Sequence, residues 1–127
     1  MILPAADELL APVTAIDGFR LGCLVDAATG MVLASKENPG GSPPMSADAS
    51  AGAADIFHVL TLLSGRLATG EGLQDVTVTF SDSFFMVRPV GLTGESQILL
   101  LIMADRQRTN LAMARRTIRD FCASLAS

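Results

Sequence analysis

The sequence has no tryptophan and no tyrosine, one histidine and two cysteines among its 127 residues. Proteins that bind single-stranded nucleic acid usually stack bases on aromatic side chains, and here all six phenylalanines lie in apolar patterns. The cysteines, Cys23 and Cys122, have no second Cys or His at metal-ligand spacing. We therefore expect no nucleic-acid binding and no metal or other cofactor. We expect both cysteines to be buried free thiols, which fits a reducing compartment.

Long apolar runs are also missing, although half of the residues are hydrophobic. The longest unbroken run, residues 98–104, is the length of a buried strand and far short of the roughly 20 residues that a membrane span needs. Residues 1–4 have neither the basic region nor the cleavage site of a signal peptide. These features predict a cytoplasmic protein without membrane insertion, folded as a single domain over residues 1–127.

The net charge of −4 is unevenly distributed along the chain. Residues 1–105 carry four basic and twelve acidic side chains, whereas residues 106–127 carry five arginines and only Asp120. We interpret Arg115, Arg116 and Arg119 as a solvated helix face that partly neutralises an acidic body. The alternative, a nucleic-acid patch, lacks aromatic stacking platforms.

The chain is organised around a long helix predicted over residues 48–69. Its apolar residues recur at i, i+4, i+7 and i+11, which is one helix stripe: Ile56, Leu60, Leu63 and Leu67. Three further apolar residues lie off this stripe: Phe57, Val59 and Leu62. A helix that is apolar on more than one side must bury more than one side. We expect the sheet of the same subunit to cover the stripe, so that something else covers the second side.

The remaining elements are short and well separated. Residues 5–16 predict a first helix, which Pro12 should kink or break. Asp105 is placed to cap a last helix near the C-terminus. Strands are predicted by alternating or continuous apolar residues over residues 19–26, 31–35, 74–80, 84–90 and 97–104. The order α-β-β-α-β-β-β-α predicts an α+β fold with a five-stranded antiparallel sheet. Residues 97–104 are apolar on both sides, so we expect that strand to be central and helices to cover both faces.

Three patterns that could carry chemistry have better structural explanations. Gly70-Glu71-Gly72 follows a helix and opens a strand, the wrong order for a dinucleotide fingerprint, so we read it as a helix stop. His58 lies one turn after Asp55 but has no nucleophile motif beside it. Arg66 could reach a nucleotide on a partner, although a solvated surface arginine is the simpler interpretation. We expect no catalytic residues and no enzyme activity.

Several short motifs resemble, in their order and spacing, the roadblock domain of dynein light chains and of bacterial partners of Ras-like small GTPases. They are Asp17-Gly18-Phe19, Leu24-Val25-Asp26, residues 30–35, residues 73–79, residues 99–105, Asn110-Leu111 and Ala114-Arg115-Arg116. The resemblance covers nearly the whole chain, and Pro12 is a departure from the family pattern. It implies a profilin-like three-layer fold and a homodimer in which central helices pack together and edge strands pair. On this chain the implied interface consists of Phe57, His58, Thr61, Leu62, Gly65, Thr77, Val78 and Thr79.

The resemblance also implies a non-enzymatic regulator or scaffold of a Ras-like small GTPase. Some family members stimulate GTP hydrolysis by repositioning the GTPase's own residues, without donating an arginine. The alanine, glycine and arginine content with a single lysine resembles stand-alone actinobacterial members. Their operons often encode a membrane sensor kinase, which implies recruitment to a membrane-associated complex. A small-molecule sensor domain and a nucleotide-independent adaptor are the alternatives that the sequence leaves open.

Overall fold

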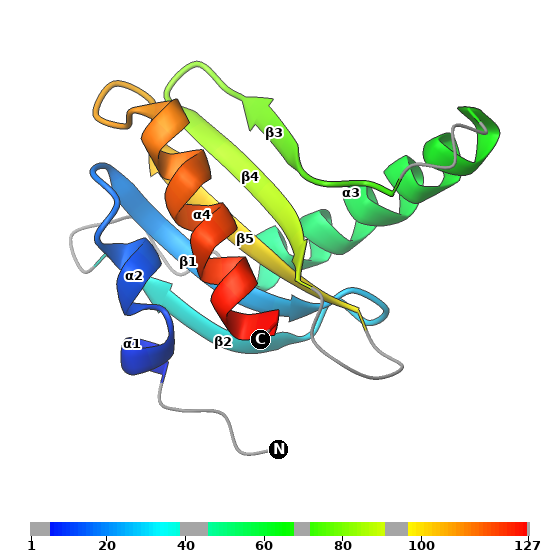
Figure 1. Cartoon of the computed structure of the whole chain (residues 1–127), viewed down its shortest axis with the longest axis horizontal. Coiled ribbons are helices and arrows are strands. Elements are labelled where there is room, and N and C mark those ends of the chain that lie inside the picture. The colour runs from blue at the N-terminus through cyan, green and yellow to red at the C-terminus, as the bar shows by residue number, and fades with distance from the viewer. Residues whose placement is uncertain (1–5, 39–45, 68–71, 91–96, 127) are drawn as a thin grey trace.

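The chain forms a five-stranded antiparallel sheet with helices on both faces (Figure 1). This computed structural model describes residues 6–38, 46–67, 72–90 and 97–126. Across the sheet the strands lie in the order β2-β1-β5-β4-β3. Their bounds are Phe19–Asp26 (β1), Val32–Glu37 (β2), Val76–Thr79 (β3), Ser83–Val90 (β4) and Ile98–Asp105 (β5). The predicted α+β class and the number of strands are confirmed.

β5 is the central strand, as its sequence predicts, and it separates two hydrophobic cores. On one face, Leu100, Ile102 and Ala104 pack in a core with residues of the N-terminal and C-terminal helices. On the other face, Leu99 and Leu101 pack in a core with residues of the long helix. All five of these side chains are almost fully buried. A strand buried on both faces requires helices on both faces, which gives the three-layer arrangement.

The predicted first helix is broken into two short helices, α1 (Ala6–Leu9) and α2 (Ala11–Thr14). Pro12 lies in the first turn of α2, where its missing N–H costs nothing because that donor has no partner within the helix. Of the two outcomes expected from this proline, a kink or a break, the break is the one observed. The side chains of Leu10 and Val13, on either side of Pro12 in the sequence, are fully buried.

The last helix, α4 (Leu111–Ala126), lies on the same face of the sheet as α2. The prediction that Asp105 caps this helix is wrong. The Asp105 carboxylate accepts a hydrogen bond from the Gln107 N–H at 2.9 Å and so shapes the turn before the helix. The cap is Asn110, whose Oδ1 accepts from the Met113 N–H at 3.2 Å.

The long helix, α3 (Ser46–Leu67), covers the opposite face and begins two residues earlier than predicted. Its small residues Ala51 and Ala54 allow close approach of the β1–β2 turn, because a Cβ at Gly30 would meet Ala51 Cα at 3.5 Å. Gly30 itself has a φ of +75°, a conformation that glycine adopts without strain. The predicted helix end at residue 69 and the first two residues of the predicted stop, residues 70 and 71, lie outside the described residues.

Both cysteines are buried free thiols, as predicted, one in each core. Burial raises the pKa of the Cys23 thiol to about 12, and the Glu37 carboxylate acts in the same direction. Burial also raises the pKa of the Cys122 thiol to about 11, against the opposing effect of Arg88. Neither thiol is therefore ionised or reactive near neutral pH.

Candidate interaction surface

The sheet of the subunit covers only the first half of α3. Ala49, Ala53, Ile56 and Phe57 pack against the core on that face. Beyond them the helix projects past the edge of the sheet (Figure 1). The small residues at the start of the helix let it lie close to the strands, and large apolar residues continue beyond Phe57, the last residue of α3 that packs against this core.

Four large apolar side chains are consequently exposed on the second half of α3. The exposed fractions are 63% for Val59, 67% for Leu62, 47% for Leu63 and 62% for Leu67. The prediction that the subunit's own sheet covers the whole stripe is therefore wrong for Leu63 and Leu67. Groups of exposed apolar side chains of this kind are typical of interaction sites.

These side chains point in two directions. At 100° per residue, Leu63 and Leu67 continue the side of α3 on which Ile56 faces the sheet. Leu62 lies about 120° around the helix from Ile56, with Val59 between the two directions. The projecting half of α3 can therefore bury apolar surface both toward a neighbouring sheet and along one flank of the helix.

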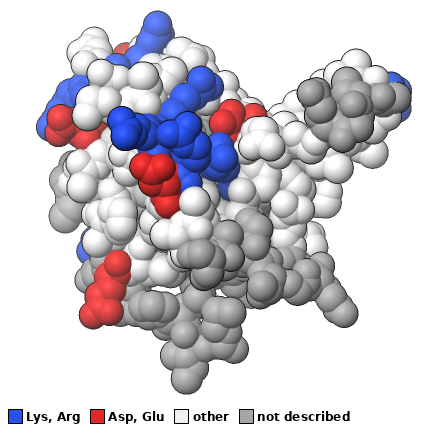
Figure 2. All heavy atoms as spheres, viewed as in Figure 1, with Lys and Arg blue, Asp and Glu red and all other residues white. Residues whose placement is uncertain are grey.

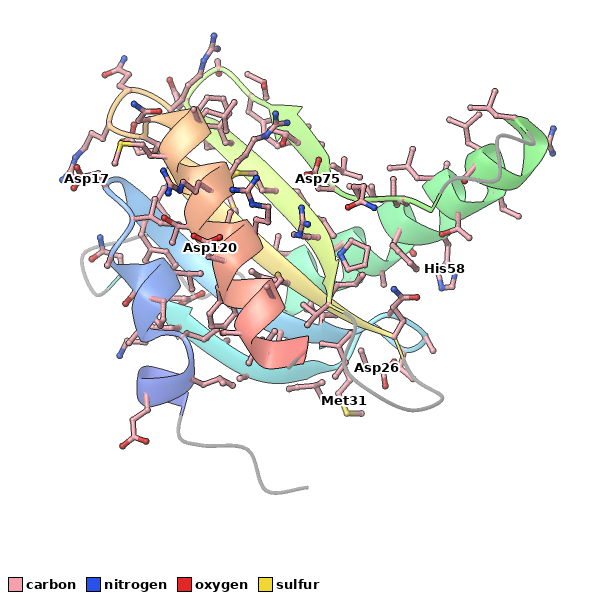
Figure 3. The ribbon with its side chains drawn as sticks, in the orientation of Figure 1. Asp17, Asp26, Met31, His58, Asp75 and Asp120 are labelled. Carbon is pink, nitrogen blue, oxygen red and sulfur yellow. The ribbon has the colours of Figure 1, made fainter. Side chains whose placement is uncertain are left out.

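The residues predicted for the helix part of the interface are placed differently from one another. Phe57 is half-buried against its own sheet, and its ring makes an edge contact with His58, with ring centroids 6.5 Å apart. His58 is exposed and points away from the helix (Figure 3). The exposed Thr61 donates its hydroxyl to the Phe57 carbonyl at 2.8 Å, so its polar atom is satisfied within the helix. Gly65 has open space around it, since an added Cβ would meet nothing within 4 Å.

The strand part of the predicted interface, Thr77, Val78 and Thr79, lies on β3, which forms one edge of the sheet. The Phe80 N–H donates to the Ser83 carbonyl at 2.8 Å, which fixes the alternation of hydrogen bonds between β3 and β4. In an antiparallel ladder the neighbouring residues alternate, so Thr77 and Thr79 direct their backbone N–H and C=O groups outward. The edge therefore offers free main-chain donors and acceptors to another strand.

The two edges of the sheet differ in their readiness to pair. β3 has a regular register with β4 and no charged side chain. β2, at the other edge, is irregular between Ala34 and Val32 in its register with β1, and it carries Lys36 and Glu37. Bulges and charges on edge strands are features that block edge-to-edge association. Of the two, β3 is the edge suited to pairing.

Two polar contacts hold β3 and the residue before it against the rest of the molecule. The Arg115 guanidinium on α4 donates to the Thr77 hydroxyl at 2.9 Å. Arg88 on β4 forms an ion pair with Asp75 at 3.3 Å. Because both partners of the ion pair are partly exposed, it contributes little to stability and serves mainly to position the chain. Arg115 is thus exposed, as predicted, but its side chain is engaged.

Other kinds of site find little support in the described ranges. No three His, Cys, Asp or Glu side chains there gather where they could hold a metal ion. No helix among these residues is both long and apolar enough to cross a membrane. A hollow of about 330 Å³ lies beside β1 and β2, far from the projecting half of α3. Its polar lining includes Asp17, Lys36 and Arg108, unlike the apolar cavity that a small-molecule sensor needs.

Solved structures resemble this chain along almost its whole length. The gliding protein MglB from Thermus thermophilus superimposes with a TM-score of 0.80 at 22% identity, over 99% of this chain and 92% of that one. A Roadblock/LC7 domain from Streptomyces avermitilis superimposes with a TM-score of 0.77 at 17% identity, over 96% and 95% of the two chains. The chain has the roadblock/LC7 fold.

A further structure, described as MglB with a tetrameric arrangement, superimposes with a TM-score of 0.81 at 22% identity, over 99% of this chain and 91% of that one. Neither known protein-family profiles nor curated proteins match the sequence. The likeness is thus structural, with little sequence identity, and it agrees with the fold that the short motifs imply.

The sequence reasoning found part of the exposed surface and missed part of it. Leu62 is exposed as expected, whereas Leu63 and Leu67, which the apolar stripe predicts to lie against the subunit's own sheet, are exposed as well. The 3.6-residue period identifies an apolar stripe without saying how far a sheet extends beneath it. The feature of the sequence that indicates where the sheet stops covering the helix is the change from small residues, Ala49 to Ala54, to large ones later in the helix.

Proposed function

We propose that this chain is a member of the roadblock/LC7 family that acts as a non-enzymatic, homodimeric regulator or scaffold of a Ras-like small GTPase. One observation carries the proposal: α3 projects beyond its own sheet with large apolar side chains exposed, directly beside an uncharged edge strand. We take residues 1–127 as one cytoplasmic domain. The fold shared with MglB and with a Roadblock/LC7 domain supports this assignment.

In the proposed dimer, β3 pairs with β3 of a second copy and the two sheets become continuous. Outward-facing main-chain groups of Thr77 and Thr79 would form the new ladder, with Val78 between them. A twofold axis perpendicular to the sheet makes this contact self-complementary. Pairing would also remove an exposed edge that could otherwise aggregate.

The same twofold axis would bring the projecting half of α3 over the sheet of the second copy. Leu63 and Leu67, on the sheet-facing side, would then pack where this subunit's own strands are absent. The two α3 helices would lie side by side. The helix residues implied by the family resemblance, which are Phe57, His58, Thr61, Leu62 and Gly65, would line the contact between them or its outer rim.

A Ras-like GTPase is the partner that the resemblance implies, and the MglB-like structure supports looking for it. The outer side of the α3 pair, near Val59, would remain available for it. Arg66 is exposed in the last turn of α3, yet the proposed regulator acts by positioning the GTPase rather than by donating this arginine. Association with a sensor kinase and recruitment to a membrane-associated complex, as in actinobacterial members, are further parts of the proposal.

The proposal is tested by mixing the purified protein with the Ras-like GTPase of its own gene neighbourhood, loaded with GDP or with a non-hydrolysable GTP analogue. Affinity and the rate of GTP hydrolysis are measured in each case. Binding that differs between the two nucleotides would establish a regulator of the switch, and the rate would say whether it activates. Equal binding would indicate a scaffold, because a ligand with equal affinity for both states shifts neither.

Absence of binding to either nucleotide form would contradict the GTPase assignment. The molecular mass from light scattering tests the dimer separately. A dimer that ignores the GTPase would favour the nucleotide-independent adaptor, and a monomer would contradict the proposed assembly altogether. Arg66→Ala provides a matched control, since loss of stimulated hydrolysis with unchanged GTPase affinity would show that this arginine is donated after all.

A further inference from the structure

Six arginines gather on the face of the molecule that lies opposite α3. They come from β4, from the turn before α4, and from α4 itself: Arg88, Arg106, Arg108, Arg115, Arg116 and Arg119. Figure 2 shows basic side chains grouped over this face, which we name the arginine face. Because the sheet separates α4 from α3, the arginine face and the projecting half of α3 point to opposite sides of the molecule (Figure 1).

Most of these arginines are not neutralised by carboxylates. Arg88 pairs with Asp75, and Arg119 lies 3.9 Å from the adjacent Asp120. The other four have no carboxylate oxygen within 4 Å among the described residues. Arg115 donates to the Thr77 hydroxyl and Arg106 to the Phe80 carbonyl at 3.3 Å, and both of these acceptors are uncharged.

The shape of the arginine face favours an extended partner over a small ligand. Five of the six arginines are spread along the exposed side of a surface helix and its preceding turn. The hollow beside Arg88 and Arg115 has a volume of only about 10 Å³. A guanidinium group binds phosphate oxygens with two parallel hydrogen bonds. The exposed Met113 adds an apolar side chain of the kind that enters a headgroup region. Stacking platforms for nucleic-acid bases are missing from the sequence.

We propose that the arginine face docks on the surface of an anionic phospholipid bilayer. The acidic body of the protein does not prevent this, because charges farther away than the Debye length, about 8 Å at physiological salt, are largely screened. Asp75 and Asp120 weaken the field of the patch locally, and Asp82 and Asp17 do so beside Arg106 and Arg108.

The proposed dimer strengthens this interaction, and only this step of the inference rests on the proposed function. Pairing through β3 about an axis perpendicular to the sheet places both arginine faces on the same side. Arg115, which contacts Thr77 on β3, would lie near the junction of the two copies. The bilayer would then meet a doubled basic surface, while the α3 pair faces the cytoplasm and its protein partner.

The test is sedimentation of the full-length protein with vesicles of phosphatidylcholine alone or with about 30% phosphatidylglycerol. We expect binding to the anionic vesicles only, and we expect high salt to abolish it. The double variant Arg116→Glu/Arg119→Glu should weaken binding to the anionic vesicles at least about 10-fold, because each basic residue near an anionic surface contributes to the free energy of binding. The matched control is Arg66→Glu on α3, an exposed helical arginine on the other side of the sheet, which should bind as the wild type does.

Two results would overturn the inference: no sedimentation of the wild type with anionic vesicles at low salt, or equal binding by the wild type and the double variant. Retention on polyglutamate or RNA without binding to vesicles would also overturn it and would identify another anionic partner. Light scattering on the same samples separates this failure from failure of the proposed function. A dimer that does not bind vesicles contradicts only the docking on a bilayer. A monomer that binds them contradicts the proposed dimer and the doubled basic surface, and it leaves the docking on a bilayer in place.

Discussion

Replacing Leu62 by arginine should convert the proposed dimer into a monomer. Leu62 is 67% exposed in the isolated subunit, so an arginine at this position meets solvent and leaves the subunit folded. In a dimer formed through α3, the same change would place a charged side chain in an apolar contact. A buried, unpaired charge is strongly disfavoured.

The expected size of the effect follows from the exposed surface. Full burial of a leucine side chain contributes about 1.5 to 3 kcal/mol, so burying the exposed two-thirds contributes about 1 to 2 kcal/mol. A twofold interface contains this contact twice, which makes about 2 to 4 kcal/mol per dimer. The dissociation constant should therefore rise by about 30-fold to 1,000-fold from the lost contacts alone, and further from the introduced charge.

The assay is light scattering over a dilution series, with circular dichroism to verify folding. The matched control is Met31→Arg, because Met31 is 64% exposed but lies at the β1–β2 turn, away from the projecting half of α3. The control should remain dimeric. If Leu62→Arg has the mass and dissociation constant of the wild type, Leu62 does not belong to the interface. Leu63→Arg would then show whether the sheet-facing side of the helix forms the contact instead.

Further predictions concern the edge strand, one turn and the thiols. Thr79→Pro removes an outward backbone donor and should weaken dimerisation at least about 10-fold, whereas Thr79→Ala keeps the donor and should not. Equal molecular masses of the two variants in light scattering would contradict edge pairing. Gly18→Ala should lower the free energy of unfolding by about 2 to 4 kcal/mol in urea titrations. The reason is that the φ of Gly18 is +85° and that an added Cβ would meet the Thr109 hydroxyl. An unchanged free energy of unfolding would contradict this geometry. Cys23 and Cys122 should react with a thiol reagent at pH 8 only after unfolding. Rapid labelling of the native protein would contradict the burial of these thiols. Because burial raises the pKa of both thiols, their contribution to the free energy of unfolding is full below pH 9 and is lost as the pH rises toward 11 to 12.

The central position of β5 and the helices on both faces of the sheet could be predicted because the patterns that specify them are local. A run that is apolar on every residue, residues 98–104, fits only a strand with both faces covered, and β5 is that strand. Pro12 likewise predicts a kink or break in the first helix, because proline lacks the backbone N–H that a continuous helix needs as a hydrogen-bond donor.

The features that sequence reasoning placed wrongly depend on tertiary distances. Asp105 and Asn110 are both good cap residues, and the choice between them depends on the length of the turn that connects β5 to α4. Leu63 and Leu67 continue a regular stripe, and their exposure depends on where the neighbouring sheet ends. Neither quantity is encoded in a short window of residues.

The projection of α3 beyond the sheet also has a consequence for how the surface comes into existence. The turns from Leu60 onward are held mainly by helical hydrogen bonds, and an unsupported helical segment of that length is only marginally stable in water. Amide hydrogens there should exchange rapidly in a dilute monomer and slowly once a second copy packs on them. The projecting half of α3 would then become fully ordered only in the dimer, so the amount of ordered surface rises with the square of the free subunit concentration. Expression level would in this way act as an input to the regulator, alongside any signal that it receives.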